Sequence, residues 1–578
     1  MPSGYPILTN FTSGEMSPRL DARVDVSKYF NACKTLYNMI VHPHGGASRR
    51  NGTHFVAETK DSSKISRLIP FQFSTEQAYI LECGDQYIRF YKDGGQIVSG
   101  VAAYEIATPY TTSLLSSIKY AQNADTMRIV NQSVWPQILT RTGHTAWTMA
   151  SVTFVNTPST WGAGNWPGSI GFYEQRCCYA GTPASPQSVW LSASQAYDDM
   201  SSGVLDDDPI EVTIDDGQVN AIQWIMPGRY LNLGTVEGEW VLSSGSDVDT
   251  PITPTKRKAT RVSNKGSSNI QAGFISDAVI FFQKFGRKVF HLGYRYVEDK
   301  YDPSDLTIFS EHITKSGIKE WTFQKEPDNI LWLCLNNGKL AGLTLNKEQE
   351  VIAWHDHQTD GYIESLAVIP TATYYQVWMI VRREINGATK RYVEYFEDDF
   401  GDNQKACWFV DCGLSYSGTA VTTVTGLDHL EGKGIVGIAD GAAISDTPIT
   451  VVSGSVTIPN AAASITLGLP FTSILEPMRL ELPLADGTSQ GRIKKIHQVV
   501  IRFYQTLGAK IGSAVGMIDT IPFRSPADLM GQPPELFSGD KVVPFAGGWD
   551  RNGYIRIQQD QPLPMTILSI MPKVTVND

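Results

Sequence analysis

Between about residues 71 and 400 the chain repeats one pattern: an apolar β-type run, a short polar or glycine turn, and a second apolar run. Valine, isoleucine, tyrosine, phenylalanine and tryptophan dominate the runs, as strands prefer. The turns carry pairs such as Asn337-Gly338 and Asn386-Gly387, which favour hairpins. Seven copies occur, starting at Ala78, Thr126, Arg176, Arg229, Ala278, Asn329 and Gln376. Each copy predicts one β-hairpin.

The seven copies recur with an average period of about 50 residues, which is typical of the blades of a β-propeller. The pattern therefore predicts a mainly β chain with a β-propeller of about seven blades, β-rich flanking platform and tip domains, and few helices. In one repeat, a hairpin over 329–345 precedes a third strand over 351–354 and a fourth over 363–369. A string of unrelated hairpins in two sandwiches remains the alternative.

The flanks of the repeats differ from them in composition, and the sequence predicts four segments. They are an N-terminal platform segment over 1–70, the propeller-like domain over 71–411, a small β domain over 412–475 and a C-terminal β-rich platform over 476–578. The first segment carries one predicted helix over 25–40, with Tyr29, Cys33, Leu36 and Ile40 at helical spacing. We expect the two flanks to pack together, because a closed propeller returns the chain near its start.

Composition and charge exclude some classes of function for this chain. The 578 residues are 42% hydrophobic with a formal net charge of −11. An acidic chain is a poor candidate for gripping nucleic acid by phosphate neutralisation, although it can surround DNA without holding it. No run of about 18 apolar residues predicts a membrane span, and the first residues do not resemble a signal peptide. The seven scattered cysteines predict free thiols rather than a disulfide framework.

Few residue patterns point to chemistry. Two close histidine pairs, His42/His44 and His355/His357, lack the further ligands that a metal needs and are expected to be polar loop side chains. The acidic clusters 206–208, 215–216 and 398–399 fit solvated turns or charges that face a lumen. No nucleophile elbow, phosphate-binding loop, dinucleotide fingerprint or nucleophile–base pair is visible. We therefore expect no enzyme activity, catalytic residue, cofactor or metal.

Other residues are assigned to packing or to contacts between subunits. Most tryptophans of the repeats are expected in the blade cores; they are Trp135, Trp147, Trp190, Trp224, Trp240, Trp332, Trp354 and Trp378. Basic clusters are candidates for interfaces with acidic partners, where charge mainly sets specificity. These candidates are Arg49, Arg50, Lys256, Arg257, Lys258, Arg492, Lys494 and Lys495. For the three residues 256–258, a plain solvated loop is the alternative.

Several long strings resemble one protein family. They are NFTSGEMSPRLDARVDVSKYFNACKTLYNMIVHPHGGASRRNGTHFV, ATPYTTSLLSSIKYAQNADTMRIVNQSVWPQILTRTGHTAW, IGFYEQRCCYAGTPASPQSVWLS and WHDHQTDGYIESLAVIP, with a weaker echo in GRIKKIHQVVIRFY. In this order they resemble the nozzle protein, or tail tubular protein B, of short-tailed bacteriophages and related prophages. The resemblance covers about residues 10–400.

The resemblance implies a structural part of a virion tail, assembled in the cytoplasm of the bacterial host. It implies a hexameric tube below an adaptor ring, attachment of tail fibres or spikes, and a channel through which double-stranded DNA passes without specific contacts. Residues 412–475 are then the candidate nozzle tip. The charged residues of that segment are candidates for the channel or gate: Asp428, Glu431, Lys433, Asp440 and Asp446.

Two other functions remain open. One is a tail-associated propeller glycoside hydrolase that degrades host-surface polysaccharide, which requires two opposed carboxylates in one cleft. The other is a propeller lectin that binds carbohydrate without turnover. Sugar release separates the first from the second.

Overall fold

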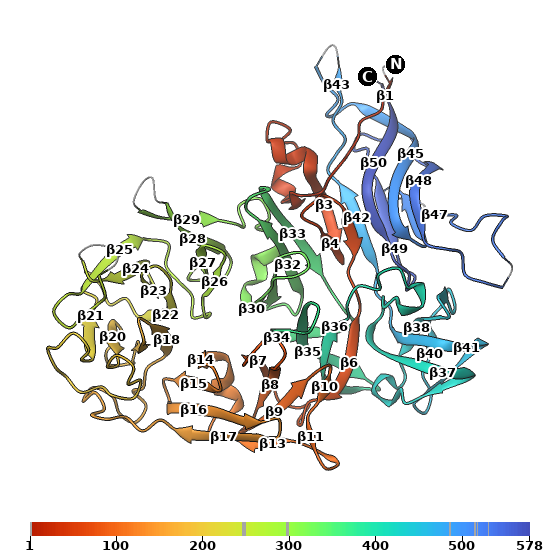
Figure 1. Cartoon of the computed structure of the whole chain (residues 1–578). Helices are drawn as coiled ribbons and strands as arrows, with labels where there is room; N and C mark the ends of the chain where they lie inside the picture. Colours follow the sequence, from red (N-terminus) through yellow and green to blue (C-terminus); the bar gives the residue numbers. More distant parts are fainter. Residues whose placement is uncertain are drawn as a thin grey trace. The chain divides into compact units, whose positions relative to one another are not determined.

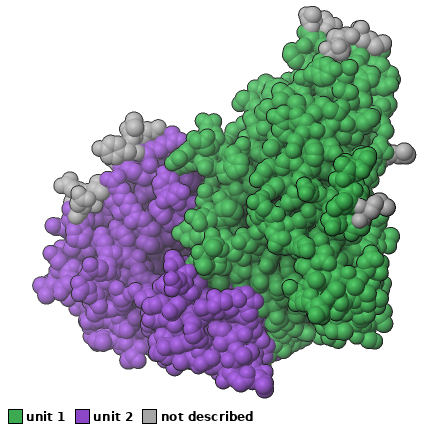
Figure 2. Space-filling model, turned by 45° about the vertical axis from the view of Figure 1, so that its right-hand side comes forward, with its two compact units in different colours: residues 1–63, 321–578 green, residues 64–320 purple. Residues whose placement is uncertain are grey.

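The computed structural model describes residues 3–577 apart from 246–249, 296–299, 485–486, 514–515, 517 and 530. The chain forms two compact units: unit 1 holds residues 1–63 and 321–578, and unit 2 holds residues 64–320 (Figure 2). Strands make up most of the regular structure (Figure 1). The helical segments of the described residues are 3-10 turns: Pro18–Leu20, Ser27–Asn31, Thr112–Ser117, Ile313–Ser316, Gln404–Ala406 and Asp428–Leu430. None of the described helices is long and apolar enough to cross a membrane.

The described residues of unit 2 form five successive antiparallel sheets and one two-stranded sheet, β11 (Val98–Ser99) with β12 (Ala102–Ala103). The first consists of β7 (Arg67–Gln72), β8 (Ala78–Gly84) and β9 (Tyr87–Lys92), with β10 (Gly95–Gln96) and β13 (Glu105–Ala107) on its edge. The second consists of β14 (Lys119–Asn123), β15 (Thr126–Asn131), β16 (Val134–Gly143) and β17 (Ala146–Ser151). The third consists of β18 (Ser169–Tyr173), β19 (Arg176–Ala180), β20 (Ser188–Leu191) and β21 (Ile210–Thr213).

The remaining two sheets of unit 2 repeat the four-strand pattern. The fourth consists of β22 (Ile222–Pro227), β23 (Leu231–Thr235), β24 (Gly238–Ser243) and β25 (Lys258–Ser263). The fifth consists of β26 (Gly273–Ile275), β27 (Ala278–Phe282), β28 (Val289–Arg295) and β29 (Lys300–Asp305). Both are therefore simple up-and-down sheets like the second and third.

Two further sheets of the same kind follow. The sixth consists of β30 (Ile318–Gln324), β31 (Ile330–Leu335), β32 (Leu340–Asn346) and β33 (Val351–His357). The seventh consists of β34 (Tyr362–Pro370), β35 (Tyr375–Ile385), β36 (Ala388–Phe396) and, from the far N-terminal part of the chain, β6 (Thr53–Glu58). Seven successive sheets, of four strands each except for the first, which has five, are the blade pattern of a β-propeller, so the predicted fold class is confirmed.

Every predicted hairpin forms, and each supplies the second and third strands of its sheet. The spacing of about 50 residues therefore reports the distance between equivalent blade strands. One detail of the prediction is wrong: the strand expected over 363–369 as the fourth of its repeat lies in β34, the first strand of the next sheet. The first strand of that repeat is β30. Its sequence, Ile-Lys-Glu-Trp-Thr-Phe-Gln, is less apolar than the hairpins from which the repeats are recognised.

The tryptophans of the repeats pack as predicted, with one exception. Seven of the eight are at most 8% exposed, and Trp135 is half-buried. Trp224 shows how closely they fit: a Cβ on Gly234, in the neighbouring strand, would lie 2.0 Å from its ring. The repeat cores are therefore built from large rings packed against small residues across the strands.

The rest of unit 1 is also β-structure and joins the two flanks, as predicted. In one sheet, β4 (Met39–Val41), β5 (Ala47–Arg49) and β1 (Ser3–Gly4) accompany β50 (Thr566–Asn577), β45 (Ile493–Thr506) and β48 (Phe537–Pro544). In another, β2 (Gly14–Glu15) and β3 (Ala32–Tyr37) accompany β33, β42 (Ser473–Pro477), β49 (Arg556–Gln559), β46 (Ala509–Gly512) and β47 (Ile518–Ile521).

Residues 411–469 form a smaller sheet. It consists of β37 (Asp411–Thr425), β41 (Ser455–Leu469), β38 (Gly434–Ala439), β39 (Ala442–Ala443) and β40 (Ile449–Thr450). One register pair, Gly413 with His54, links β37 to β6 and hence to the seventh sheet. Two of the seven sheets therefore share a unit with both flanks and with this small sheet, whereas the limits of the four predicted segments stay a prediction.

The predicted helix over 25–40 is wrong. Only Ser27–Asn31 is helical, as a single 3-10 turn, and the chain continues directly into β3. Strand β3 pairs with β42 through Leu36 and Leu475, and the Leu36 N–H donates to the buried Glu15 carboxylate at 2.7 Å. These distant partners satisfy the backbone and override the local helical spacing. Cys33 and Leu36 are still buried, but in a sheet.

The junction between β6 and the seventh sheet contains a buried ion pair. The Glu394 carboxylate accepts two hydrogen bonds from Arg383 at 2.8 Å and one from the Thr53 hydroxyl at 2.5 Å. Both side chains of the ion pair are fully buried. Removing one partner of such a pair leaves an uncompensated buried charge, which is strongly destabilising.

We predict that Glu394→Gln lowers the free energy of unfolding by about 3–5 kcal/mol. The urea midpoint of the circular dichroism signal measures the change. Asp540→Asn is the matched control, because it breaks the exposed Arg502–Asp540 pair and leaves the midpoint where it is. A midpoint for Glu394→Gln that equals the control would show that this pair does not hold the seventh sheet together.

Candidate functional site

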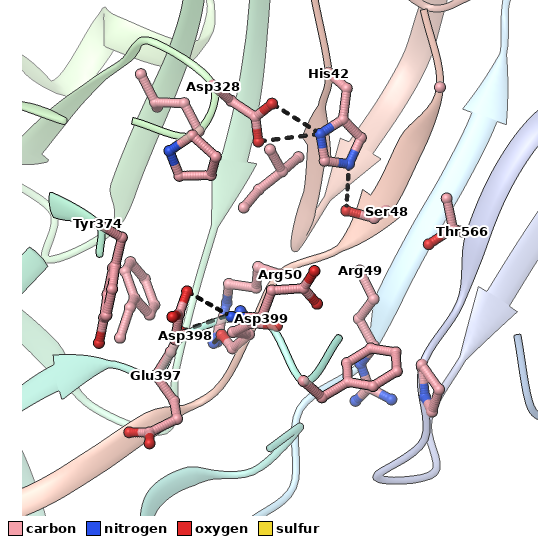
Figure 3. Close-up of a pocket in the computed structure, with 18 of the residues that line it drawn as sticks. His42, Ser48, Arg49, Arg50, Asp328, Tyr374, Glu397, Asp398, Asp399 and Thr566 are labelled. Carbon is pink, nitrogen blue, oxygen red and sulfur yellow. Dashed lines mark hydrogen bonds and ion pairs between the residues drawn. The ribbon is translucent and has the colours of Figure 1, made fainter. Parts of the chain in front are cut away.

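A cavity of about 560 Å³ lies within unit 1 (Figure 3). Strands β4, β5 and β50 contribute one part of its wall, and the loops before β31 and after β36 contribute another. It is the best candidate for a functional site because ionisable, hydroxyl and aromatic side chains from distant parts of the chain converge on it. Its labelled residues in Figure 3 are His42, Ser48, Arg49, Arg50, Asp328, Tyr374, Glu397, Asp398, Asp399 and Thr566.

A tight turn positions His42 in this cavity. The His42 N–H donates to the Gly46 carbonyl at 2.9 Å, and the Gly45 N–H donates back to the His42 carbonyl at 3.0 Å. Gly45 has a φ of +112°, and a Cβ there would lie 2.7 Å from the Asn10 side chain. Glycine is therefore required at this position, and the turn brings the chain from β4 directly back into β5.

The His42 ring is held from both sides. Its Nδ1 lies 3.0 Å from each carboxylate oxygen of Asp328, and its Nε2 lies 2.8 Å from the Ser48 hydroxyl (Figure 3). Ser48 is the middle residue of β5, in register with Ile40 on one side and Thr566 on the other. The His42 and Asp328 side chains are 24% and 12% exposed, and Ser48 is half-buried. The group is therefore ordered but reachable from the cavity.

The opposite wall is acidic and aromatic. Glu397, Asp398 and Asp399 follow the end of β36, and Phe396, Phe400 and Tyr374 lie beside them. Burial raises the pKa of Asp398, and the neighbouring Asp399 and Glu397 raise it further. Burial also raises the pKa of Tyr374, with the same acidic run contributing. This wall disfavours additional negative charge.

Arg49 and Arg50, predicted at a subunit interface, lie inside unit 1 and are 3% and 2% exposed. Arg50 forms a bidentate ion pair with Asp411, with both N–O distances at 2.7 Å. Arg49 donates to the carbonyl oxygens of Phe471 and Leu563 at 2.6 and 3.1 Å. Burial lowers the pKa of Arg49 to about 9, and Arg50 adds to the effect. Burial alone would raise the pKa of Asp411, but Arg50 outweighs it and keeps that pKa below its ordinary value. These two arginines hold segments of one chain together.

The other interface candidates are not brought into one cluster. Lys256, Arg257 and Lys258 are exposed in unit 2, as the solvated-loop alternative expects. In unit 1, Lys494 is 1% exposed, and burial lowers its pKa. Arg492 and Lys495 are half-buried. Among the basic candidates, the exposed residues are therefore Lys256 and Arg257, in the loop before β25, and Lys258, the first residue of β25.

The five predicted channel or gate residues all lie in the segment that connects β37 to β41. Glu431 accepts from the Ser453 and Gly454 N–H groups at 3.0 and 2.8 Å, and Lys433 pairs with Asp360 at 2.8 Å. Asp440 accepts from the Ser464 N–H, Asp446 accepts from Gln561, and Asp428 begins the 3-10 turn Asp428–Leu430. Their assignment to a gate stays a prediction.

The pair His355/His357 is not in a loop, contrary to the prediction. Both residues lie on β33, where a spacing of two places them on one face. Both are buried, with His355 Nδ1 2.5 Å from His357 Nε2. Gly342 on β32 makes room, since a Cβ there would lie 2.0 Å from the His355 ring. In the described part of the chain, no group of three histidine, cysteine or acidic side chains could hold a metal ion.

Of the residues that line the cavity, sequence patterns indicate His42, His44, Arg49, Arg50, Asp398 and Asp399, but not Ser48, Asp328 or Tyr374. Asp328 is 286 residues from His42 and carries no motif of its own. Ser48 and Tyr374 stand in ordinary strand and turn sequences. The one local signal is the glycine pair after His42, which indicates a tight return and hence a hydroxyl six residues later in contact with the ring.

No protein-family model matches this sequence, and no curated protein is similar to it. Among solved structures, the WD40 repeats of RRP9 cover 60% of this chain and 99% of that chain, with 8% identity and a TM-score of 0.38. The Neurospora crassa Pan2 WD40 domain covers 61% and 96%, with 10% identity and a TM-score of 0.34. A structure of YCF48 bound to D1 peptide covers 60% and 96%, with 10% identity and a TM-score of 0.34. Similarities of this size do not bear on function.

The buried histidines predict a pH dependence of stability. Burial lowers the pKa of His355 to about 3, and it also lowers the pKa of His357 well below its ordinary value. Unfolding restores values near 6.5, so between about pH 6.5 and 3 the unfolded state binds more protons than the folded state. The free energy of unfolding therefore falls as the pH falls through this window, by up to about 1.4 kcal/mol per pH unit for each histidine.

We predict that His357→Leu makes this pH dependence shallower by the contribution of one histidine. Urea midpoints measured from pH 7 to pH 5 give the slope. His144→Gln, at an exposed position of unit 2, is the control and keeps the full slope. An unchanged slope in His357→Leu would mean that His357 already accepts a proton in the folded protein.

Proposed function

We propose that the chain is a structural subunit of the hexameric tail nozzle of a short-tailed bacteriophage or related prophage. Two lines of support carry the proposal. One is the set of long strings in residues 10–400 that resemble the nozzle family in content and order. The other is a structural observation: strand β37 has a long, exposed edge that is free of charge and proline.

The edge of β37 lacks the usual protection. Beyond Ser415, β41 is the one strand paired with β37 in the described part of the chain, and β37 contains no proline, whereas β41 carries Pro459. Of the 30 residues in the two strands, Asp411 is the one charged residue, and it is buried. Most side chains over 415–425 are exposed threonine, serine, glycine and alanine.

An exposed, uncharged strand edge is a template for pairing with another chain, and monomeric proteins usually protect such edges with charges or proline. A second copy of the same chain is a natural partner for it. When one patch contacts a different patch on the next copy, the interfaces are heterologous, and they close into a ring when the rotation between copies is an exact fraction of a full turn. This is the kind of interface that a cyclic hexamer requires.

The charge balance suits a passage for DNA. Six copies at −11 each carry −66 in total. A negative wall repels phosphates and keeps a passing duplex from adhering. In this proposal the partners are the adaptor ring, tail fibres or spikes and non-specific double-stranded DNA, and the site of action is the virion tail. The cavity in unit 1 is not needed for this role.

We predict that electron microscopy of the purified chain, alone or with its adaptor ring, shows six-fold rings with an axial channel. Thr422→Lys combined with Thr423→Lys places charge on the exposed edge of β37 and shifts the protein to monomers, because a lysine must be desolvated to enter a shared sheet. Mass photometry gives the ratio of rings to monomers. Ala388→Lys, at an exposed hairpin position of the seventh sheet, is the control and leaves rings intact.

Two results would argue against the proposal. If the chain stays monomeric both with and without the adaptor ring, it does not form the hexamer that the proposal requires. Sugar release from host polysaccharide by such a monomer would favour the alternative of a propeller glycoside hydrolase, and binding without release would favour a lectin.

A further inference from the structure

The contacts of His42 reproduce the order of groups in a serine hydrolase. A carboxylate, Asp328, lies at hydrogen-bond distance from Nδ1, and a hydroxyl, Ser48, lies at hydrogen-bond distance from Nε2. Such a constellation is recognised by geometry and roles rather than by position in the sequence. From this arrangement we infer that Ser48, His42 and Asp328 form a hydrolytic triad for small carboxylic esters that are neutral or cationic.

Each of the three groups is placed for its role. The Asp328 carboxylate accepts the Nδ1 proton of His42, which fixes the tautomer with the lone pair on Nε2. That lone pair lies 2.8 Å from the Ser48 oxygen, within reach of its proton. Ser48 and His42 are the catalytic residues in this inference. Asp328 is a positioning residue that acts through the ring.

The reaction balances without a cofactor. The Ser48 oxygen attacks the ester carbonyl carbon, its proton moves to His42 Nε2, and the bond to the leaving alkoxy oxygen breaks as that oxygen takes the proton. Water then attacks the acyl-serine, passing one proton to His42. The carboxylic acid leaves, and Ser48 regains its proton. The overall change is the addition of one water across the ester bond, with no oxidation or reduction.

Strand pairing and a tight turn fix Ser48 and His42. Ser48 lies between two hydrogen-bonded neighbours, β4 and β50, rather than in a loop. The Gly45–Gly46 turn fixes the distance between His42 and Ser48 along the chain. Side chains held by regular strands keep a catalytic geometry more precisely than side chains on mobile loops.

The cavity sets the class of substrate. A volume of about 560 Å³ lies within the range of small-molecule sites. The acidic run of Glu397, Asp398 and Asp399 repels anionic substrates, while the ring of Tyr374 offers apolar contact for an acyl or ring group. Arg49 and Arg50 also line the cavity, but Arg50 is paired with Asp411 and Arg49 donates to backbone carbonyls. Short-chain esters of neutral or cationic alcohols fit this lining best. The site belongs to a single chain, so the inference does not depend on the proposed ring.

The test uses the full-length protein and two probes. A fluorophosphonate is expected to label one serine per chain, and peptide mapping places the label on Ser48. p-Nitrophenyl acetate is expected to be hydrolysed catalytically, with release of p-nitrophenol. This ester has a good leaving group, so its cleavage depends little on stabilisation of the oxyanion. Label on another serine, or no label, would overturn the inference.

Variants extend the test. Ser48→Ala and His42→Ala are expected to reduce hydrolysis by about 10³-fold or more, and Asp328→Asn to reduce it and change its pH profile by favouring the wrong tautomer. Ser133→Ala, at an exposed serine of unit 2, is the control and keeps full activity. Hydrolysis that survives Ser48→Ala would contradict the triad. If a variant fails to fold, the label on the unchanged protein still decides.

The charge of the substrate is tested separately. The anionic ester p-nitrophenyl hemisuccinate is expected to react about tenfold more slowly than the acetate, because the acidic wall opposes its carboxylate. Equal rates for the two esters would show that the acidic run does not select against anionic substrates, whichever serine the fluorophosphonate labels.

Discussion

The structure of unit 1 depends on the pairing of one N-terminal strand with a strand more than 330 residues later. Strand β6 completes the seventh sheet along β36, with Thr53 in register with Phe396 and Glu58 with Tyr392. Without β6, β36 would present an unpaired edge, which proteins avoid. Strand β6 also carries the register pair of His54 with Gly413 that links this sheet to β37.

Two buried ion pairs set the register around this strand. At the start of β6, the Thr53 hydroxyl donates to Glu394, which is paired with Arg383. Three residues before β6, Arg50 is paired with Asp411. Neither ion pair need make the protein more stable than apolar side chains of the same shape would. The reason is that removing the charges from water costs about as much free energy as their attraction returns. Their effect is selective: a shift of one residue in either strand would leave a buried charge without its partner. The register of the closing strand is therefore specified by charge as well as by packing.

Much of the fold could be predicted from the sequence because the blade hairpins are local. Each is a pair of apolar runs around a short turn, and their spacing reports the repeat directly. Strands such as β30 and β3 could not be recognised, because their partners, rather than their own residues, determine that they are extended. The cavity was hidden for the same reason: His42, Asp328 and Tyr374 meet through the sheets and not along the chain. A charge pattern also cannot distinguish a buried arginine such as Arg50 from a surface one.

The split of unit 1 along the chain also imposes an order of events during synthesis. Unit 2 is one continuous stretch, whereas Thr53 waits for Glu394, which is made 341 residues later. At ribosomal rates of roughly 5–20 residues per second, this delay lasts on the order of tens of seconds. Through that interval the nascent chain carries β6 without its partner strand β36. During this time β6 of one chain could pair with β36 of another chain instead of its own. The rate of translation therefore determines how long strands can be exchanged between chains.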